Sequence, residues 1–356
     1  MRFIHCADLH LDSKMSANLG KEEAKRRKAE ILHTFERMVE YAAAHGVCGI
    51  LIAGDMFDTS HVTATTRNAV LFQMNSHPDI QFYYLSGNHD NDNFLTSIDV
   101  IPSNLKFFHT VWTSYDLGEI VISGIDLTLE NTDVAHASLV LDSGKFNIVM
   151  MHGQEGELVR IRELKNKGID YLALGHVHAY KKEELDARGT YCYSGCLEGR
   201  GFDECGKHGF VVLDVNEATG EYSHEFVSFA KRELHAVSVD VTGCQTTSEM
   251  VIKISDALEQ SGCMETALVK IVLTGTLDVE CEKNVDYILT RFQSQFYFVK
   301  IYDETTLKIS VEDYMFDQSL KGEYVRKIMQ DDTLGDAEKA VIIRYGLQAI
   351  AGEEVQ

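Results

Sequence analysis

The chain is short of the residues that mark linkers, membrane spans and secreted proteins. It has only 2 prolines among 356 residues, so we expect no proline-rich linker. No apolar run reaches the length that crosses a bilayer, and the N-terminus turns polar too soon for a secretory signal. We also find no internal repeat and no low-complexity segment. This length and composition predict a globular protein of more than one domain.

Basic residues are outnumbered, with 33 Lys and Arg against 55 Asp and Glu and a formal net charge of −22. Proteins that bind nucleic acid are normally basic, so the charge argues against strong free-standing binding to DNA. Local binding stays open, because bound divalent metals can reverse the sign of one pocket on an acidic protein.

The cysteines, 8 in all, are scattered along the chain. Without a secretory signal they indicate reduced thiols in a cytoplasmic protein. Four zinc-type donors do occur close together, but they lack the paired Cys-x-x-Cys knuckle. A structural zinc site therefore stays an alternative to an ordinary loop at Cys192, Cys196, Cys205 and His208.

Short apolar strands in the first two-thirds of the chain each run into a polar cluster. Strands that are apolar on both faces belong in a buried sheet. Helical apolar stripes alternate with them, which predicts a layered α/β sandwich. Ligands of such sheets gather beyond the carboxyl ends of the strands, where these clusters fall. The strands cover 2–7, 49–53, 82–85, 146–151 and 171–174, and the helices 22–45, 63–76 and 157–167.

From about residue 235 the polar clusters disappear. Strand patterns at 235–242, 267–277 and 296–302 alternate with helical patterns at 248–260 and 280–295. This order predicts a small βαβαβ module. The segments 320–329 and 336–350 are typical of amphipathic helices. We predict a first domain over 1–230, a second domain over 231–312 and a helical segment over 313–356.

The polar residues at the strand ends offer carboxylate, amide and imidazole donors without a thiolate. Such a mixture suits Mn²⁺, Fe or Zn²⁺ better than a soft metal. Two ions about 3.5–4 Å apart can clamp a phosphoryl group and generate hydroxide. A single His at a strand end is more often a surface residue, and Gly-Asn-His-Asp alone could be a turn. Clusters on successive strand ends favour a site made of Asp8, His10, Asp55, Asn88, His89, His152, His176 and His178.

The segments DLH, GDMFD, GNHD, MMHG and GHVH occur in the order typical of the calcineurin-like metallophosphoesterases, which the chain resembles over residues 8–178. The resemblance implies a four-layer α/β/β/α sandwich with a dinuclear metal centre. It implies one ion held by Asp8, His10, Asp55 and His178. It implies a second ion held by Asp55, Asn88, His152 and His176.

His89 matches the catalytic histidine of that family, which binds no metal, contacts the phosphate and protonates the leaving oxygen. The resemblance also implies that Asp90 orients His89, as carboxylates commonly orient imidazoles near metals. Within the superfamily the chain is most similar to SbcD-type DNA repair exonucleases of the YhaO-like branch. This similarity rests on HCADLHLDS, LIAGDMFD, HGQE, YSGCLEGRGFDECGKHGFVVLDV and the tail YGLQAIAGEE.

That similarity implies an α+β capping domain after the first domain and a Mn²⁺-dependent DNA exonuclease or endonuclease. It further implies homodimers and an SMC-like ABC ATPase of the SbcC type as partner. The alternative is a phosphodiesterase or phosphatase acting on a small molecule or nucleotide, which the acidic charge favours. A catalytically inert scaffold is disfavoured by the complete donor set. Candidate DNA contacts, each also explained as a surface charge, are Arg160, Arg162, Lys165, Lys181, Lys182 and Arg200.

Overall fold

The computed structural model describes residues 1–15, 19–58, 62–90, 94, 98, 100–308 and 314–351. The chain divides into two units, Met1–Glu233 and Leu234–Gln356. The predicted boundary after residue 312 lies outside the described residues, as does 352–356 at the end of the predicted helical segment, so the three-part division stays a prediction. Among the described residues, no helix is both long and apolar enough to cross a membrane.

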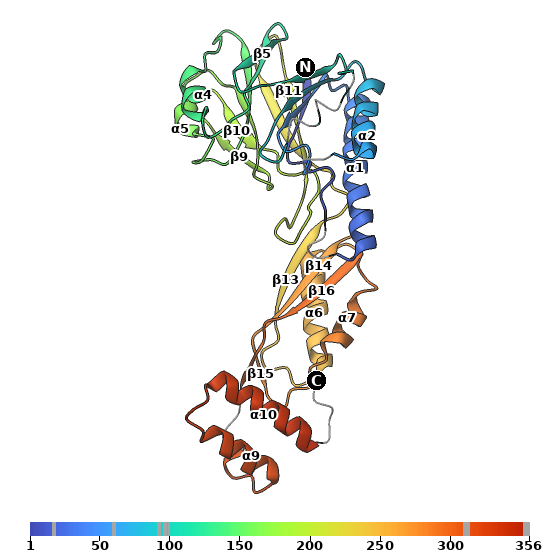
Figure 1. The fold of residues 1–356 in the computed structure, drawn as a ribbon, viewed down its shortest axis with the longest axis vertical. Helices are drawn as coiled ribbons and strands as arrows, with labels where there is room; N and C mark the ends of the chain where they lie inside the picture. Colours follow the sequence, from blue (N-terminus) through green and yellow to red (C-terminus); the bar gives the residue numbers. More distant parts are fainter. Residues whose placement is uncertain are drawn as a thin grey trace. The chain divides into compact units, whose positions relative to one another are not determined.

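The first unit is built on two six-stranded sheets (Figure 1). The first sheet has the order β12-β11-β1-β2-β3-β4. Strands β1 to β4 are parallel, β11 pairs antiparallel with β1, and β12 pairs antiparallel with β11. Its strands are β1 (Arg2–Cys6), β2 (Gly49–Ala53), β3 (Gln81–Leu85), β4 (Leu105–Phe107), β11 (Gly209–Val215) and β12 (Tyr222–Ser228).

The second sheet has the order β5-β6-β7-β8-β10-β9. The strands β6, β7, β8 and β10 are parallel, and β5 and β9 pair antiparallel at the two edges. Its strands are β5 (Thr113–Asp116), β6 (Ile120–Gly124), β7 (Phe146–His152), β8 (Tyr171–Gly175), β9 (Lys181–Glu184) and β10 (Thr190–Tyr193).

Apolar side chains of the two sheets pack face to face, with Phe3 and Leu51 of the first sheet in one cluster with Ile148 of the second. Helices α1 (Lys21–Ala44) and α2 (Ala64–Ser76) cover the outer face of the first sheet. The short helices α4 (Thr132–Ser138) and α5 (Ile161–Leu164) pack against the second sheet. The layers are therefore α/β/β/α, which confirms the predicted fold class.

The helix expected over 157–167 is only the single turn α5. Lys165 is extended after it, and Asn166 adopts a left-handed backbone with φ of 61°. The backbone N–H of Asn166 donates to the carboxylate of Asp186 at 2.5 Å instead of continuing a helix. A tertiary hydrogen bond therefore ends the helix early, although the apolar spacing continues.

The second unit follows the predicted βαβαβ order. Its parallel sheet β13-β14-β16 packs its apolar face against the two helices of the module. The strand expected over 267–277 is split at Gly275, whose φ is 102°. The elements are β13 (Leu234–Asp240), α6 (Thr247–Ser261), β14 (Leu268–Thr274), β15 (Thr276–Asp278), α7 (Val285–Phe292), β16 (Phe298–Asp303) and β17 (Thr306–Lys308).

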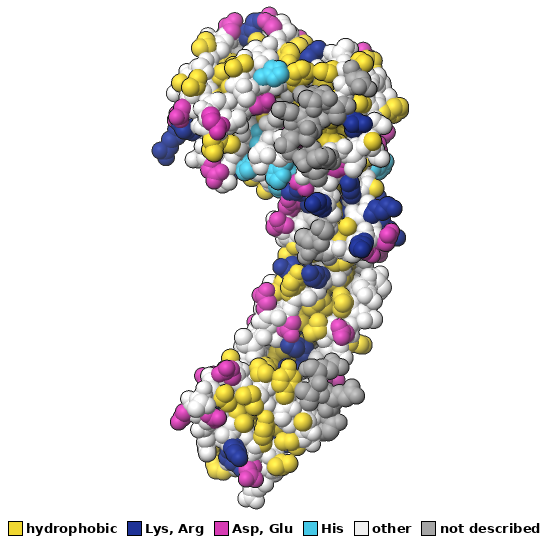
Figure 2. Space-filling view, viewed as in Figure 1, with side chains coloured by type: hydrophobic (Ala, Val, Ile, Leu, Met, Phe, Trp, Pro, Cys, Tyr) yellow, Lys and Arg dark blue, Asp and Glu magenta, His cyan; other side chains and the backbone are white. Residues whose placement is uncertain are grey.

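Helices α9 (Leu320–Met329) and α10 (Asp336–Ala351) end the described chain. Val325 of α9 packs with Ile343 and Leu347 of α10, so part of their apolar surface is buried between them. Other apolar side chains of this pair stay exposed, and Figure 2 shows hydrophobic side chains gathered in this part of the second unit. The exposed ones include Leu320, Val341, Tyr345 and Ile350.

Candidate metal centre

The carboxyl ends of β1, β2 and β3 meet those of β7 and β8, and this brings the predicted donors together. Asp8, His10 and His178 place ligand atoms within 4.8 Å of one another, and we call them the first donor group. Asp55, His152 and His176 do the same and form the core of the second donor group. Each group combines residues from both sheets, so the sandwich itself assembles the site.

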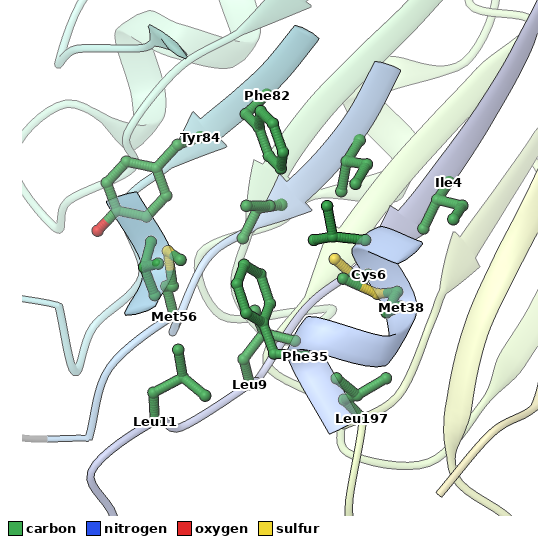
Figure 3. Packing of buried hydrophobic residues seen from close by; sticks show 14 of the residues in the cluster. Ile4, Cys6, Leu9, Leu11, Phe35, Met38, Met56, Phe82, Tyr84 and Leu197 are labelled. Carbon is green, nitrogen blue, oxygen red and sulfur yellow. The ribbon is translucent and has the colours of Figure 1, made fainter. Parts of the chain in front are cut away.

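Alternation after β1 turns its donors toward the site. Leu9 and Leu11 are buried in the cluster that α1 forms with the first sheet, and Figure 3 shows them near Phe35. Asp8 and His10 lie between these leucines in sequence and make their side-chain contacts with the metal-type donors instead. The apolar residues therefore fix which way the polar ones face.

In the first donor group, Nε2 of His10 and Nε2 of His178 lie 3.2 Å apart. An Asp8 carboxylate oxygen is 4.0 Å from the same atom of His178. Both imidazoles thus turn one nitrogen toward a shared point that also faces a carboxylate. This convergence suits a divalent cation, since imidazole and carboxylate are its common ligands.

In the second donor group, the amide oxygen of Asn88 lies 3.0 Å from Nε2 of His152 and 3.0 Å from Nδ1 of His176. Asp55 faces both groups, because its Oδ2 is 3.4 Å from Nε2 of His152 and 3.9 Å from Nε2 of His10. A carboxylate placed between two donor groups can bridge two ions. The residues present therefore fit a dinuclear centre.

Backbone strain is concentrated at the donors. Asp8, His10, Asp55 and His176 have φ values of 52°, 44°, 51° and 98°, a region that residues other than glycine rarely adopt. Hydrogen bonds hold the strained ends together, since the N–H groups of Asp8 and His10 donate to the carbonyls of Gly54 and Asp55 at 3.0 Å. Strain of this kind persists where the surrounding structure enforces it, often at functional sites.

Three glycines allow the close packing around these donors. A Cβ at Gly54 would collide with the His152 ring, and one at Gly87 would collide with the Asp55 carboxylate. A Cβ at Gly175 would collide with the carbonyl oxygen of Ala53. Gly87, the first residue of the Gly-Asn-His-Asp segment, must therefore lack a side chain, because a Cβ there would collide with Asp55.

Asp55 and His152 form a close buried pair. Burial opposes their charges, yet the contact with His152 lowers the pKa of Asp55 to about 2, and Asp55 raises the pKa of His152 to about 9. Burial raises the pKa of Asp8 to about 6. Nδ1 of His152 contacts the carbonyl of Ala53 at 2.9 Å, which leaves Nε2 for a metal.

His89 lies at the edge of the site with a side chain that is 48% exposed. Its Nδ1 is 3.4 Å from Oδ1 of Asp58, and the same oxygen is 3.0 Å from Nδ1 of His10. The exposed ring can reach a substrate. The carboxylate beside it belongs to Asp58, the last residue of the GDMFD segment, to which sequence reasoning gave no role.

Asp90 differs from the expectation that it orients His89. Its buried carboxylate accepts hydrogen bonds from the backbone N–H groups of Met56, Phe57 and Gly87, at 3.2, 2.9 and 3.0 Å. Burial raises its pKa to about 6. Asp90 therefore ties the loop after β2 to the loop after β3, and it supports the site through the backbone.

The alternative zinc site does not assemble in the structure. Cys192 is buried between the two sheets, whereas Cys205 is exposed. Sγ of Cys196 lies 3.1 Å from Nδ1 of His208, and both are buried. Within the described ranges, groups of three or more metal-type donors occur only around the strand ends.

Comparison with known proteins identifies a family and several relatives of the chain. Residues 1–180 match the calcineurin-like phosphoesterase family. The chain is 26% identical over 310 residues to YhaO of Bacillus subtilis, described as an uncharacterized metallophosphoesterase, with 78% of this chain and 72% of that protein covered. It is 24% identical over 276 residues to the DNA double-strand break repair protein Mre11 of Methanopyrus kandleri, with 67% and 59% covered. A solved structure, TT1561 of Thermus thermophilus, is 11% identical with a TM-score of 0.42 and covers 63% of this chain and 98% of its own.

Proposed function

Because the chain belongs to the calcineurin-like phosphoesterase family and is a metal-dependent phosphoesterase, we propose that it hydrolyses phosphodiesters at a dinuclear centre. The observation that carries the proposal is the position of Asp55, whose carboxylate faces both donor groups. Mononuclear hydrolases have no need for a carboxylate placed in this way, whereas a two-metal centre has.

In this proposal, one ion is held by Asp8, His10, Asp55 and His178. The other is held by Asp55, Asn88, His152 and His176. Bound ions would polarise the phosphoryl oxygens and lower the pKa of a nucleophilic water. We take Mn²⁺ as the first choice, with Fe and Zn²⁺ as alternatives, because the donors are carboxylate, amide and imidazole groups.

His89 acts as the general acid in this proposal. Asp58 faces Nδ1 of the ring, so Nε2 is the nitrogen that would give a proton to the leaving oxygen. The exposure of the ring supports this role, since a general acid must reach the substrate. The backbone N–H of His89 donates to Oδ1 of Asp55 at 2.8 Å, which fixes the main chain of His89 to the proposed bridging ligand.

DNA is the substrate that we propose first, with a cytoplasmic repair role beside an SMC-like ATPase of the SbcC type. Support comes from the similarity to proteins named for DNA double-strand break repair. The exposed apolar side chains on α9 and α10 would give the coiled coil of such an ATPase a place to dock. Homodimerisation belongs to the same proposal.

A small phosphodiester is the second candidate, and the ion pairs made by three of the six candidate DNA contacts favour it. Arg160 pairs with Asp133 and Glu163, Lys181 with Glu155 and Glu183, and Arg200 with Asp58 and Glu204. Cations neutralised by their own neighbours contribute little to phosphate binding, which depends on free Lys and Arg.

One assay compares the two candidates. The purified protein with Mn²⁺ is given linear double-stranded DNA or bis-p-nitrophenyl phosphate, with and without a candidate ATPase, and a His89→Gln preparation serves as the background control. Cleavage of DNA supports the nuclease. Cleavage of the small diester alone, even with the ATPase present, favours the second candidate. Protein that binds two ions yet cleaves neither substrate would contradict phosphodiester hydrolysis.

A further inference from the structure

Glu204 lies behind the first donor group, against the nitrogen of His178 that is turned away from Asp8. Its Oε1 is 2.7 Å from Nδ1 of His178, and its side chain is only 6% exposed. The contact places a proton on Nδ1 and leaves Nε2, which faces His10 and Asp8, free to bind a cation. A carboxylate in this position also makes the imidazole a more basic ligand.

Arg200 fixes the carboxylate of Glu204. The backbone N–H of Arg200 donates to Oε2 of Glu204 at 2.7 Å, and its guanidinium donates to Oε1 at 2.8 Å. The guanidinium also reaches Oδ1 of Asp58 at 3.2 Å. Arg200 therefore joins Glu204, which is hydrogen-bonded to His178, to Asp58, which lies 3.0 Å from Nδ1 of His10.

The second donor group is supported differently. The outer nitrogen of His152 contacts the neutral carbonyl of Ala53, not a carboxylate. A neutral acceptor orients the ring but raises its basicity less than a carboxylate does. His178 of the first group and His152 of the second therefore differ in the charge placed behind their outer nitrogens.

We propose that Glu204, held by Arg200, is a positioning residue that makes the first donor group the tighter of the two metal sites. The proposal rests on the dinuclear centre proposed above and adds an order of affinity to it. Glu204 touches neither substrate nor metal in this role, and it acts through His178.

The test measures Mn²⁺ binding to the full chain by calorimetry and by the electron paramagnetic resonance of Mn²⁺. We expect two ions of unequal affinity in the unmodified protein, with the spectrum of a spin-coupled pair at saturation. Glu204→Ala should weaken the tighter ion by about 10–100-fold. Glu204→Gln should weaken it less, because the amide oxygen still accepts the proton on Nδ1 of His178.

A second variant shows which donor group loses affinity for Mn²⁺ when Glu204 is replaced. His176→Ala removes a ligand of the second donor group alone, so the ion that remains reports on the first group. Adding Glu204→Ala to His176→Ala should lower the affinity for this remaining ion by the same factor. An unchanged affinity would overturn the proposal.

Glu198→Gln is the matched control. Glu198 is a buried carboxylate of the same loop, and it accepts hydrogen bonds from Arg27 and Thr34 rather than from a proposed ligand. It should lower the melting temperature of the metal-free protein and keep both Mn²⁺ affinities. An equal loss of affinity in Glu198→Gln would show that loop integrity is responsible and would contradict the role of Glu204.

Two outcomes separate this proposal from the one on which it rests. Unmodified protein that binds fewer than two Mn²⁺ ions would contradict the dinuclear centre itself. Two ions bound with unchanged affinities in Glu204→Ala would leave that centre intact and remove only the positioning role. If Glu204→Ala fails to fold, Glu204→Gln and Arg200→Gln provide the comparison, and wild-type affinities in both would overturn the proposal.

Discussion

Oδ1 of Asp58 lies 3.4 Å from Nδ1 of His89 and 3.0 Å from Nδ1 of His10. One carboxylate therefore contacts both the proposed general acid and a proposed metal ligand. Asp90, the neighbour of His89 in sequence, instead holds backbone N–H groups of two loops. The proposed general acid and the proposed metal ligand thus share a contact with the loop after β2.

His89→Gln tests the general acid. We expect kcat on bis-p-nitrophenyl phosphate to fall by about 10²–10⁴-fold, the usual contribution of general acid catalysis. Metal content should stay at the wild-type level, because His89 is not among the proposed ligands of either ion. Parallel metal analysis and steady-state kinetics check this, and an unchanged kcat would rule out the role.

Asp58→Asn tests the support of His89. The amide keeps the shape of the side chain but loses the charge beside both imidazoles. We expect kcat to fall by about 10–100-fold, with a shifted pH profile of kcat and a small change in melting temperature. An unaltered pH profile together with wild-type kcat would remove Asp58 from the catalytic arrangement.

Asp90→Ala should act on stability first. The substitution leaves the N–H groups of Met56, Phe57 and Gly87 without their acceptor, and an unsatisfied buried group costs about 1–3 kcal/mol. We expect a free energy of unfolding that is lower by at least that amount, measured by urea denaturation. If stability is unchanged while kcat falls as far as in His89→Gln, Asp90 has the direct role that the sequence suggested.

The acid sensitivity of the fold should depend on His5 of β1. Its ring is fully buried between Tyr171 and the carbonyl of Leu174, with His224 nearby, and burial lowers its pKa from 6.5 to about 3. Between pH 6.5 and about pH 3, the imidazole of His5 is therefore protonated in the unfolded chain but not in the folded chain. Its contribution to stability is present above pH 6.5 and is lost as the pH falls toward 3.

Replacing His5 by Gln should flatten this dependence. We expect the urea midpoint of metal-free His5→Gln to change less between pH 7 and pH 5 than that of the unmodified protein. The control is His33→Gln, since His33 has a side chain that is 58% exposed. If the urea midpoint changes equally with pH in the His5 and His33 variants, His5 is not responsible for the loss of stability in acid.

The strand ends could be predicted because each buried strand carries its donors directly after it. The residues that support these donors, Glu204 and Asp58, could not be predicted in the same way. Glu204 is 26 residues from His178 in sequence, and only the folding of the loop between β10 and β11 brings them together. Asp58 lies within a recognised segment, but its histidine partners follow β1 and β3 and its arginine partner lies between β10 and β11. The single-turn α5 shows the same limit, since a contact with Asp186 overrides the local helical pattern.

Gly87→Ala tests whether space beside Asp55 is required for the metal centre. A Cβ at Gly87 would collide with the carboxylate and the backbone N–H of Asp55, so the proposed bridging ligand must move. A misplacement of about 1 Å in an active site can cost about 10²-fold in rate. We therefore expect both Mn²⁺ affinities and kcat to fall. The control is Gly144→Ala, where the nearest atom would be Oδ1 of Asp142 at 3.2 Å. Calorimetry and kinetics on both variants check this, and wild-type metal binding in Gly87→Ala would show that Asp55 does not need this packing to hold two ions.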